Sequence, residues 1–436
     1  MPDAAPALRP VHPYGRPGES ISLHGGPVTH RGQSKPGRVE LRLSPETEVA
    51  WLLEGSDGPS LGSVDLTLQL PAGALSVGGE CNRSSMAESA GYLREAEVGV
   101  RDAAMRRVLV HWLNLPQICS PGVICDAASR TTYTGRWHTQ LGEWAVTLDR
   151  RADYRGVWAQ ARQAGSIVMT HVMAIERADS GAFTAEEIEP VLDALQLGMS
   201  FAVGRWVSPA LPVGLDSDGR RVWERWSADL CTPGAPGALR WWPNQRHDDL
   251  AELLELLVGR FANPDERFTL RFLLGSAVQS AAGGLVEQRI MTAFAAIEHL
   301  MWTRLVTVGG MSKTKYEHKD FNAHEKLAKV LGEAGIEQGI DENLLPGLHA
   351  AGQRQPSDRR TGPVIACRIR NMIVHPTDHE DELYRRDKKL VQQAWLLTQH
   401  YLVLLVLNHL GFRGHGRRLI APGGWASDVA PMPWAT

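Results

Sequence analysis

Cysteine is scarce in this sequence, and the few cysteines follow no familiar pattern. The 436 residues contain five cysteines, of which only Cys119 and Cys125 lie close together. Zinc-finger spacing needs two such near pairs, so the spacing disfavours a structural zinc site. A small, odd number of cysteines is typical of reduced thiols in a cytosolic protein.

The sequence also lacks an excess of charge of one sign, a long apolar run and an N-terminal secretory signal. Lysine and arginine number 46 against 49 acidic residues, for a formal net charge of −3. This balance excludes a histone-like sheath for nucleic acid but not a local basic patch. The longest apolar run, near 401–407, is shorter than the roughly 18 residues that cross a bilayer, which predicts a buried core helix. The first twenty residues are proline-rich and lack the apolar region of a secretory signal. We therefore expect a cytoplasmic protein that does not contact a membrane.

The remaining composition is that of a globular protein. Hydrophobic residues make up 43% of the chain and charged residues 22%, which excludes wholesale disorder, collagen and a coiled-coil rod. The length predicts two or three domains. The predicted fold class is α+β, with a mainly antiparallel β domain followed by an all-α helical bundle. The predicted boundaries are a flexible proline-rich tail over 1–20, the β-rich domain over 21–240, the helical domain over 245–415 and a flexible tail over 416–436.

Strand patterns dominate the first half of the chain. Apolar residues alternate with polar ones around 39–43, 64–70 and 144–148, which places one strand face on a core and the other in water. Two further strands flank the sequence Asp-Ser-Asp-Gly at 216–219, which predicts a hairpin. One helix interrupts the strands, because Thr184 and Glu187 have the spacing of a capping box.

Helical patterns take over near residue 245. The linker over 231–245 carries three prolines and two glycines, as a domain boundary often does. An amphipathic helix is predicted from the apolar spacing over 290–301. Another helix is predicted over 361–375, and a long apolar one over 384–410 ends before Gly411.

A cluster of arginines precedes the most distinctive motif of the helical half. Its members are Arg354, Arg359, Arg360, Arg368 and Arg370, opposed only by Asp358. Two interpretations remain open: a solvated, charged loop, or a surface that faces the phosphates of a nucleic acid.

The motif itself lies at the end of the helix predicted over 361–375. Asn371 and His375 are four residues apart and so share a helix face, and the long side chain of Arg370 can reach the same place. Pro376 disfavours helical geometry at His375, which places the imidazole at the helix end. His375 and His379 have the spacing of metal ligands, but Pro376 breaks the helix that would align them. We therefore expect no metal and no cofactor.

Arg370 and His375, separated by four residues, resemble the R-x4-H motif of HEPN domains. The sequence AFAAIEHL, with Glu298, is similar to the first long helix of the Apea-like HEPN family, and LVLLVLNHLGF is similar to its last helix. The resemblance covers residues 262–412. Residues 21–240 resemble, more loosely, the β-rich region that precedes this domain in bacterial defence proteins.

The resemblance implies a metal-independent endoribonuclease of a prokaryotic defence or toxin system. Two motifs would meet across a homodimer, and the 2′-hydroxyl of the RNA would attack the adjacent phosphate. Arg370, Asn371 and His375 would then be catalytic, Glu298 would support them, and the RNA would be bound by Arg354, Arg359, Arg360 and Arg368. These residue types suit the chemistry, since His375 can move a proton near neutral pH and Arg370 offers a fixed fork of donors to phosphate. The alternative is a non-catalytic module that dimerises or binds nucleotides.

The remaining features offer weaker hypotheses. A basic loop follows Met311 and is either solvated or an RNA contact. No P-loop and no GxSxG elbow is present. Ten tryptophans in and just after the β-rich half fit core packing best, with a sugar-binding surface as the alternative. In the defence architecture this half would sense a phage-derived trigger.

Overall fold

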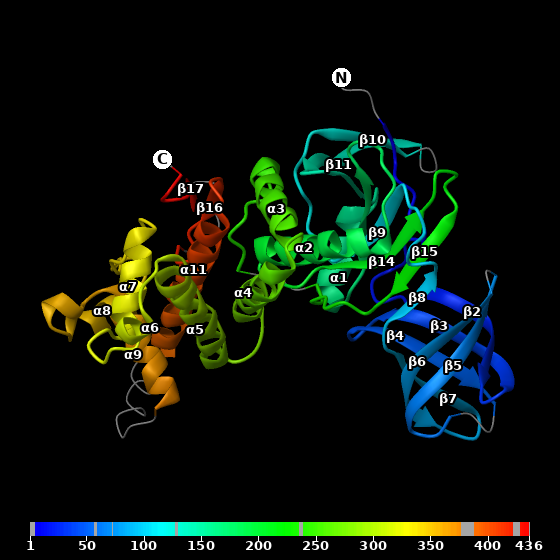
Figure 1. Ribbon diagram of the computed structural model, residues 1–436, viewed down its shortest axis with the longest axis horizontal. Helices are drawn as coiled ribbons and strands as arrows, with labels where there is room; N and C mark the ends of the chain where they lie inside the picture. Colours follow the sequence, from blue (N-terminus) through cyan, green and yellow to red (C-terminus); the bar gives the residue numbers. More distant parts are fainter. Residues whose placement is uncertain are drawn as a thin grey trace. The chain divides into compact units, whose positions relative to one another are not determined.

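The computed structural model describes residues 5–55, 59–71, 73–126, 130–234, 239–375, 388–421 and 428–435. The chain forms two compact units. Unit 1 comprises Met1–Gln196 and Trp206–Gly237, and unit 2 comprises Leu197–Arg205 and Ala238–Thr436. Figure 1 shows that strands dominate the first unit and helices the second. The β-rich character predicted for the first half is therefore confirmed.

A closed antiparallel barrel forms the first part of unit 1. Its strands follow the order β2-β3-β4-β7-β6-β5, drawn in blue in Figure 1. The alternating residues Val39, Leu41 and Leu43 are all buried inside it, as their period of two predicts. Glycine at position 91 lets β6 and β7 approach closely, because a Cβ there would lie 1.8 Å from the carbonyl oxygen of Glu80. The strands are β2 (Ile21–His30), β3 (Gln33–Leu43), β4 (Thr47–Glu54), β5 (Gly62–Leu70), β6 (Gly73–Ser84) and β7 (Glu88–Leu93).

An open sheet forms the rest of unit 1. In the described chain it has nine strands in the order β1-β10-β11-β12-β13-β9-β14-β15-β8. The predicted hairpin is β14–β15, closed by Asp216, whose carboxylate accepts the backbone N–H groups of Asp218 and Arg220 at 2.9 Å each. The strands are β1 (Ala5–Pro6), β8 (Ala96–Gly99), β9 (Arg107–Leu113), β10 (Gly122–Asp126), β11 (Thr131–Leu141), β12 (Trp144–Arg150), β13 (Met169–Arg177), β14 (Ser208–Leu215) and β15 (Arg221–Trp226).

Two helices accompany the sheet, α1 (Tyr154–Ala164) and α2 (Ala185–Val203). The capping box that opens α2 is confirmed, since the Glu187 carboxylate accepts the backbone N–H of Thr184 at 2.8 Å. The end of α2 belongs to unit 2, where the bare Cα of Gly198 faces the side chains of Leu254 and Leu257. The sequence predicts one domain boundary near 240. It does not reveal that the end of α2 packs in unit 2, because that contact depends on Gly198, which has no side chain.

Residues 5–12, which belong to the segment predicted as a flexible tail, lie on the sheet of unit 1. β1 pairs in parallel with β10. The imidazole Nε2 of His12 lies 2.7 Å from a carboxylate oxygen of Glu224, and both side chains are buried. His111 Nε2 accepts the backbone N–H of Val11 at 3.1 Å. Acceptors on other strands bind the backbone N–H groups of this segment. The segment is therefore held on the sheet despite its many prolines.

The helices of unit 2 pack around α5 and α11, which lie against each other. The stripe predicted over 290–301 is confirmed, since Ile290, Phe294, Ile297 and Met301 are all buried. The helices are α3 (His247–Phe261), α4 (Pro264–Ala282), α5 (Val286–Trp302), a π-helical turn (Thr303–Val308), α6 (Lys313–Tyr316), α7 (Ala323–Glu333), α8 (Pro346–Gln353), a 3-10 turn (Ser357–Arg359), α9 (Gly362–Val374) and α11 (Lys388–Leu410).

The prediction of an all-α HEPN bundle for this half is wrong. Residues after 415, predicted as a tail, contribute an antiparallel ladder of β16 (His415–Arg417) and β17 (Val429–Pro431). Hydrogen bonds tie the ladder and the residues around it to the rest of unit 2, and one of them runs from the His415 N–H to the Asp249 carboxylate of α3 at 3.2 Å. The N–H of Arg417 donates to the carbonyl of Trp241 at 2.7 Å, and the Trp434 indole N–H donates to the carbonyl of Phe412 at 2.6 Å. The two strands of the ladder are short and separated in sequence, so local periodicity does not predict that they pair.

Helix α11 is the only described helix long and apolar enough to cross a membrane by length and composition. Its most apolar window is 72% buried within the protein, as expected of a core helix. It packs against α4, α5, α8 and α9 of the same chain. Residues 384–387 of the predicted long helix lie outside the described residues.

Candidate functional site

The site predicted from the sequence lies at the carboxyl end of α9. This helix buries Ile365, Ala366 and Ile369 and ends at Val374. The backbone N–H of His375 still donates to the carbonyl of Asn371 at 2.8 Å, but His375 itself has left helical geometry, with φ −121° and ψ 83°. The proline that follows explains this exit, because its ring crowds the preceding residue out of the helical region. The imidazole is therefore exposed at the helix end.

Arg370 is held in place by two side chains. Its Nη2 donates to Oε1 of Glu298 on α5 at 2.5 Å, and its Nη1 donates to Oδ1 of Asn371 at 3.0 Å. The Nε of Arg370 is buried and has no hydrogen-bond partner among the described residues. Three of the four residues predicted at the catalytic centre thus lie in direct contact, and Glu298, which was predicted only through the family resemblance, comes from a distant helix.

Aromatic and buried side chains lie on the inner side of this ion pair, whose carboxylate is partly exposed. The guanidinium carbon of Arg370 lies 6.0 Å from the ring centre of Phe294. Burial raises the pKa of the Cys367 thiol to about 12, which keeps it protonated and excludes it as a nucleophile near neutral pH. Burial, with a contribution from the Glu298 carboxylate, also raises the pKa of Tyr316. Neither Phe294 nor Tyr316 was predicted as a residue of the site, although Tyr316 lies among the lysines of the basic loop.

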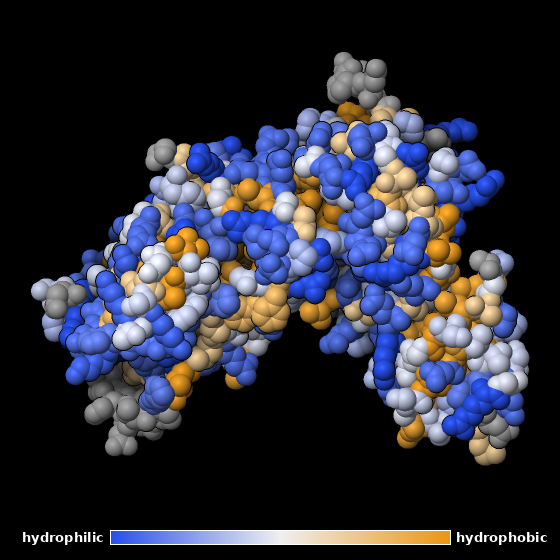
Figure 2. Space-filling view, viewed as in Figure 1, coloured by the Kyte–Doolittle hydropathy of each residue, from blue (hydrophilic) through white to orange (hydrophobic). Residues whose placement is uncertain are grey.

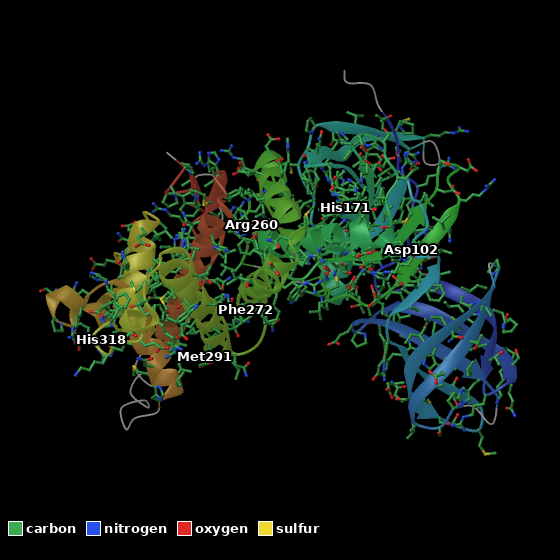
Figure 3. The ribbon with its side chains drawn as sticks, in the orientation of Figure 1. Asp102, His171, Arg260, Phe272, Met291 and His318 are labelled. Atoms are coloured by element: carbon green, nitrogen blue, oxygen red, sulfur yellow. The ribbon has the colours of Figure 1, made fainter. Side chains whose placement is uncertain are left out.

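An open groove lies beside the end of α9. It is formed by the turn at Gly283 and Gly284, the first turns of α5, and Ile373 of α9. Met291, labelled in Figure 3, belongs to its wall. Arg289 closes one side, since its guanidinium lies 5.0 Å from the Trp395 ring and its Nε donates to the carbonyl of Gly283 at 3.0 Å. The groove gives an extended ligand room next to the motif.

Three of the other arginines do not gather around His375. Arg354, Arg359 and Arg360 lie before the start of α9, and a helix of that length separates them from its end by roughly 20 Å. Arg360 is engaged locally, by Gln353 Oε1 at 2.7 Å and the Gln355 carbonyl at 3.1 Å. Arg368 is exposed and lies one turn before Asn371 on the same helix face, roughly 200° around the helix from Arg370. Of the four predicted RNA contacts, Arg368 therefore lies near the motif, whereas Arg354, Arg359 and Arg360 lie beyond the other end of α9. His379, the possible metal ligand, lies outside the described residues.

The basic loop after Met311 folds over α7. Lys315, His318 and Lys329 line a second open groove there with Phe321, and His318 is labelled in Figure 3. The ammonium of Lys326 lies 4.2 Å from the ring centre of Tyr316. Since Tyr316 is also close to Glu298, this cationic and aromatic surface continues toward the ion pair.

Exposed apolar side chains are found on α4 rather than on α11. Phe268 is 79% exposed and Phe272, one turn on, is 36% exposed. Figure 2 shows apolar atoms at the surface over α4 and α5. The apolar circumference of α11 is covered by its own chain, so it does not by itself call for a second copy. In and after the β-rich half, eight tryptophans are buried (Trp51, Trp112, Trp137, Trp144, Trp223, Trp226, Trp241 and Trp242), which fits core packing.

Comparison with known proteins gives two family matches. Residues 100–236 match the YopA central domain, and residues 269–429 match the YopA C-terminal domain. The chain is 28% identical over 287 residues to the SPbeta prophage-derived uncharacterized protein YopA of Bacillus subtilis (strain 168). That match covers 65% of this chain and 63% of the relative. No solved structure matches.

These matches correct the resemblance drawn from the motif. The helical half matches a YopA domain and no HEPN family, so its assignment to the Apea-like HEPN family is wrong. The physical reason is that an arginine and a histidine five positions apart, flanked by apolar helices, occur by chance in many chains that contain a buried helix with a polar end. The arrangement of Arg370, Glu298 and Asn371 stands independently of that assignment.

Proposed function

We propose that unit 2 is a metal-independent endoribonuclease whose centre is Arg370, Glu298, Asn371 and His375. The observation that carries the proposal is an arginine held by a carboxylate and an amide one turn before an exposed imidazole. Cleavage by the 2′-hydroxyl of RNA requires a base, an acid and stabilisation of the phosphate. These residue types supply all three without a metal ion.

Each side chain has a definite role in this proposal. Arg370 stabilises the charge that develops on the phosphate, and Asn371 and Glu298 fix the direction of its guanidinium. Glu298 is partly exposed and retains a second oxygen that can accept a proton. His375 transfers a proton to or from the RNA near neutral pH. RNA would lie along the groove beside α9, with the loop after Met311 or the arginines Arg354, Arg359, Arg360 and Arg368 as further contacts.

The proposal includes a homodimer, a cytoplasmic location and a part in conflict between phage and host. A second copy would bring two His375 side chains to one phosphate, and the exposed Phe268 and Phe272 on α4 offer an apolar surface for it. The similar protein of Bacillus subtilis is described as prophage-derived, which agrees with a toxin or defence role. Unit 1 would then sense a phage-derived trigger.

A second candidate is a non-catalytic interaction module. It is favoured by the ion pair itself, since a carboxylate that neutralises Arg370 also suits a purely structural latch between α5 and α9. Under this interpretation the pair stabilises the fold and RNA is not cleaved.

One experiment separates the two candidates. The full chain is incubated with a mixed RNA pool in EDTA, and the fragment ends are sequenced. We expect fragments with 2′,3′-cyclic phosphate ends from the wild type and none from His375→Ala. His349→Ala, which removes a half-exposed histidine of α8, is the matched control and should cleave normally. Cleavage that survives His375→Ala would remove this residue from the chemistry.

A further inference from the structure

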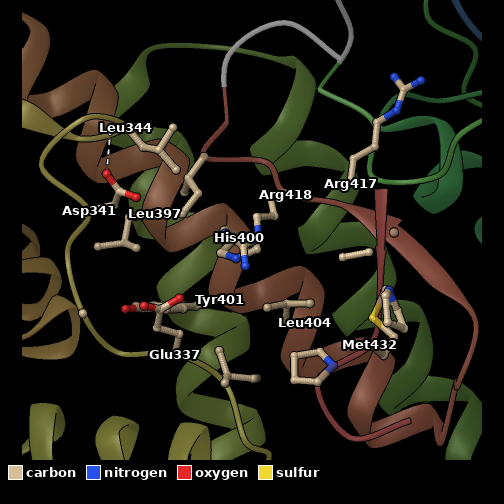
Figure 4. A pocket seen from close by; sticks show the side chains of 17 residues that line it. Glu337, Asp341, Leu344, Leu397, His400, Tyr401, Leu404, Arg417, Arg418 and Met432 are labelled. Atoms are coloured by element: carbon tan, nitrogen blue, oxygen red, sulfur yellow. Dashed lines mark hydrogen bonds between the residues drawn. The ribbon is translucent and has the colours of Figure 1, made fainter. Parts of the chain in front are cut away.

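The charged side chains around the cavity beside α11 of unit 2 face solvent. Glu337, Asp341 and Arg418 line this cavity (Figure 4), and all three are exposed. Water satisfies them, so they need no ligand as a partner. Buried polar side chains that have a peptide segment as their partner are found instead on the sheet of unit 1.

Polar side chains from four strands form a row across one face of that sheet. Asp149 of β12 is opposite Val172 of β13, which is opposite His111 of β9. Residues directly opposite one another in neighbouring antiparallel strands point to the same face. The row, called the polar row below, consists of Arg136 (β11), Asp149, His111 and Glu224 (β15).

Residues 5–15, called the strap below, run over the polar row. Oδ2 of Asp149 accepts the backbone N–H of Leu8 at 2.7 Å, and Nε2 of His111 accepts the backbone N–H of Val11 at 3.1 Å. The row therefore holds the strap by its backbone, which is how extended peptides are commonly recognised.

Glu224 adds a preference for one kind of side chain. Its Oε1 lies 2.7 Å from the imidazole Nε2 of His12, and both side chains are buried. The other groups of the row bind backbone atoms, which every peptide offers. A peptide that follows the row therefore needs an imidazole or a cationic side chain at the position of His12.

The sheet itself orients the groups of the polar row. Arg136 donates two hydrogen bonds to Asp149, of 2.7 Å from Nε and 2.6 Å from Nη2. Because Nε2 of His111 faces N–H donors, the ring proton is on Nδ1, which donates to the carbonyl of Leu211 at 3.0 Å. Burial, with a contribution from His12, lowers the pKa of His111 to about 3 and keeps its imidazole neutral near pH 7. The row is thus prepared for a peptide by bonds that do not involve the strap.

The strap is held less firmly than the strands beneath it. In the described chain, β1 pairs with β10 over Ala5 and Pro6 alone. Among residues 5–15 only His12 is buried, and three residues are prolines, which have no N–H to donate. Few buried contacts and few backbone hydrogen bonds characterise segments that open locally while the rest of a domain stays folded.

We propose that the polar row is a peptide-binding track, and that an extended segment of another protein displaces the strap from it. This rests on the proposed role of unit 1 as a sensor, and it specifies the trigger as a peptide with an imidazole or cationic side chain for Glu224. A second copy of this chain offers the same strap, so exchange between copies replaces each bond by an identical one and costs the freedom of two separate molecules. A segment of another protein can gain over the strap, because a lysine or arginine at the position of His12 is charged near neutral pH.

Binding of a synthetic peptide tests this assignment. A fluorescein-labelled peptide with the sequence of residues 5–16 is titrated at pH 7.5 with the wild-type full chain and with the full chain carrying His12→Ala, and fluorescence anisotropy is measured. We expect saturable binding to the variant, and binding to the wild type that is about tenfold weaker or more, because the intact strap competes. The same peptide with His12→Ala should bind the variant chain about tenfold more weakly. Absence of saturable binding to the variant, or equal affinity of the two peptides for it, would overturn the proposal.

A second substitution assigns the side-chain preference to Glu224. In the full chain with His12→Ala and Glu224→Gln, the difference between the two peptides should shrink to about twofold. The control combines His12→Ala with Glu186→Gln, at an exposed carboxylate of α2, and should keep the tenfold difference. A tenfold difference that persists without the Glu224 carboxylate contradicts the assignment.

Hydrogen exchange of the wild-type chain tests the opening of the strap without any substitution. The amides of Leu8 and Val11 should exchange about a hundredfold faster than the paired amides of β13, because the strap opens while the sheet stays folded. Equal rates would mean that the strap leaves only when unit 1 unfolds, and the proposal would then be wrong.

Competition separates a second copy from another protein as the occupant of the row. Excess unlabelled wild-type chain should not displace the labelled peptide from the His12→Ala chain, because its strap remains on its own row. Displacement as effective as that by the unlabelled peptide would assign the row to a second copy instead, against the proposal. RNA is absent from all these measurements, so their outcome is independent of the proposed nuclease.

Discussion

Arg370 and Glu298 are 72 residues apart in the sequence, yet a nitrogen of one lies 2.5 Å from an oxygen of the other. The bond joins the last turns of α9 to the carboxyl-terminal part of α5. It therefore fixes both the register of the two helices and the direction of the guanidinium. The proposed catalysis and the structural latch share this one contact, so substitutions at the pair are the most informative.

Arg370→Lys should abolish RNA cleavage while the protein stays folded. Lysine keeps the positive charge and can still approach Glu298, but it lacks the planar fork that binds Glu298, Asn371 and phosphate together. We expect about a hundredfold loss of cleavage rate, the size typical of removing one oriented donor to a developing oxyanion. Initial rates on a fluorogenic RNA, with circular dichroism as a folding control, measure this. Full activity in the lysine variant would show that a point charge suffices.

Glu298→Gln should lower the cleavage rate about tenfold and shift its pH profile. Glutamine can still accept a hydrogen bond from Arg370, but it can neither neutralise the charge nor accept a proton. The acidic limb of the profile of kcat should therefore flatten. Under the latch interpretation the melting temperature falls and the shape of the pH profile does not change.

Unit 1 should lose stability as the pH falls below about 6.5. Burial lowers the pKa values of His111 and His171 to about 3 each, whereas an unfolded chain restores the ordinary value near 6.5. Between these values the unfolded state binds more protons, so stability is full above pH 6.5 and declines toward pH 3. At pH 4.5 each histidine contributes a loss of roughly 2–3 kcal/mol.

Urea unfolding at pH 7.5 and pH 4.5 measures this loss. His111→Gln should start from a lower stability at pH 7.5, because it disturbs the bonds from Val11 and His12. It should then lose less than the wild type on acidification. An equal loss in the wild type and this variant would contradict a role for His111 in the acid response.

Phe268→Asp should weaken self-association if α4 carries the dimer surface. Phe268 is among the most exposed large apolar side chains described, and a charge there disfavours burial against a second copy. Light scattering at micromolar concentration should report a dimer for the wild type and a monomer for the variant. Leu230→Asp, at an exposed apolar position of unit 1, is the control and should remain dimeric. A monomeric wild type that still cleaves RNA would contradict a composite site.

Gly362→Ala should destabilise unit 2 by about 1–3 kcal/mol, because its Cβ would overlap the Tyr401 hydroxyl. Combining it with Tyr401→Phe should recover part of this loss. Gly259→Ala on α3 is the matched control, since nothing lies within 4 Å of the added Cβ and alanine favours a helix. Denaturant unfolding of the four proteins measures the coupling. Strict additivity of the two substitutions would show that the hydroxyl is not the obstacle.

Local patterns predicted the elements of this fold well. The alternation at Val39, Leu41 and Leu43 gave strands of the barrel, and the spacing over 290–301 gave the buried face of α5. The capping box at Thr184 and the end of α9 at His375 were also visible, since each depends on residues within a few positions of each other. Glu298 was named as a supporting residue only through a family resemblance that the comparisons contradict, and its ion pair with Arg370 is known only from the structure.

Only the tertiary structure decided which of these elements meet. Periodicity tells which face of an element is buried but not what covers it, so the sequence could not show that α11 is covered by its own chain. It could not show that the segment after 415 pairs as a ladder, or that the end of α2 packs in unit 2 through Gly198. Nor could it show that the Tyr401 hydroxyl packs against Gly362 of α9, because that contact depends on a residue with no side chain. These features depend on contacts between segments that are distant in the sequence, whereas a sequence pattern reflects only contacts between residues that are close in it.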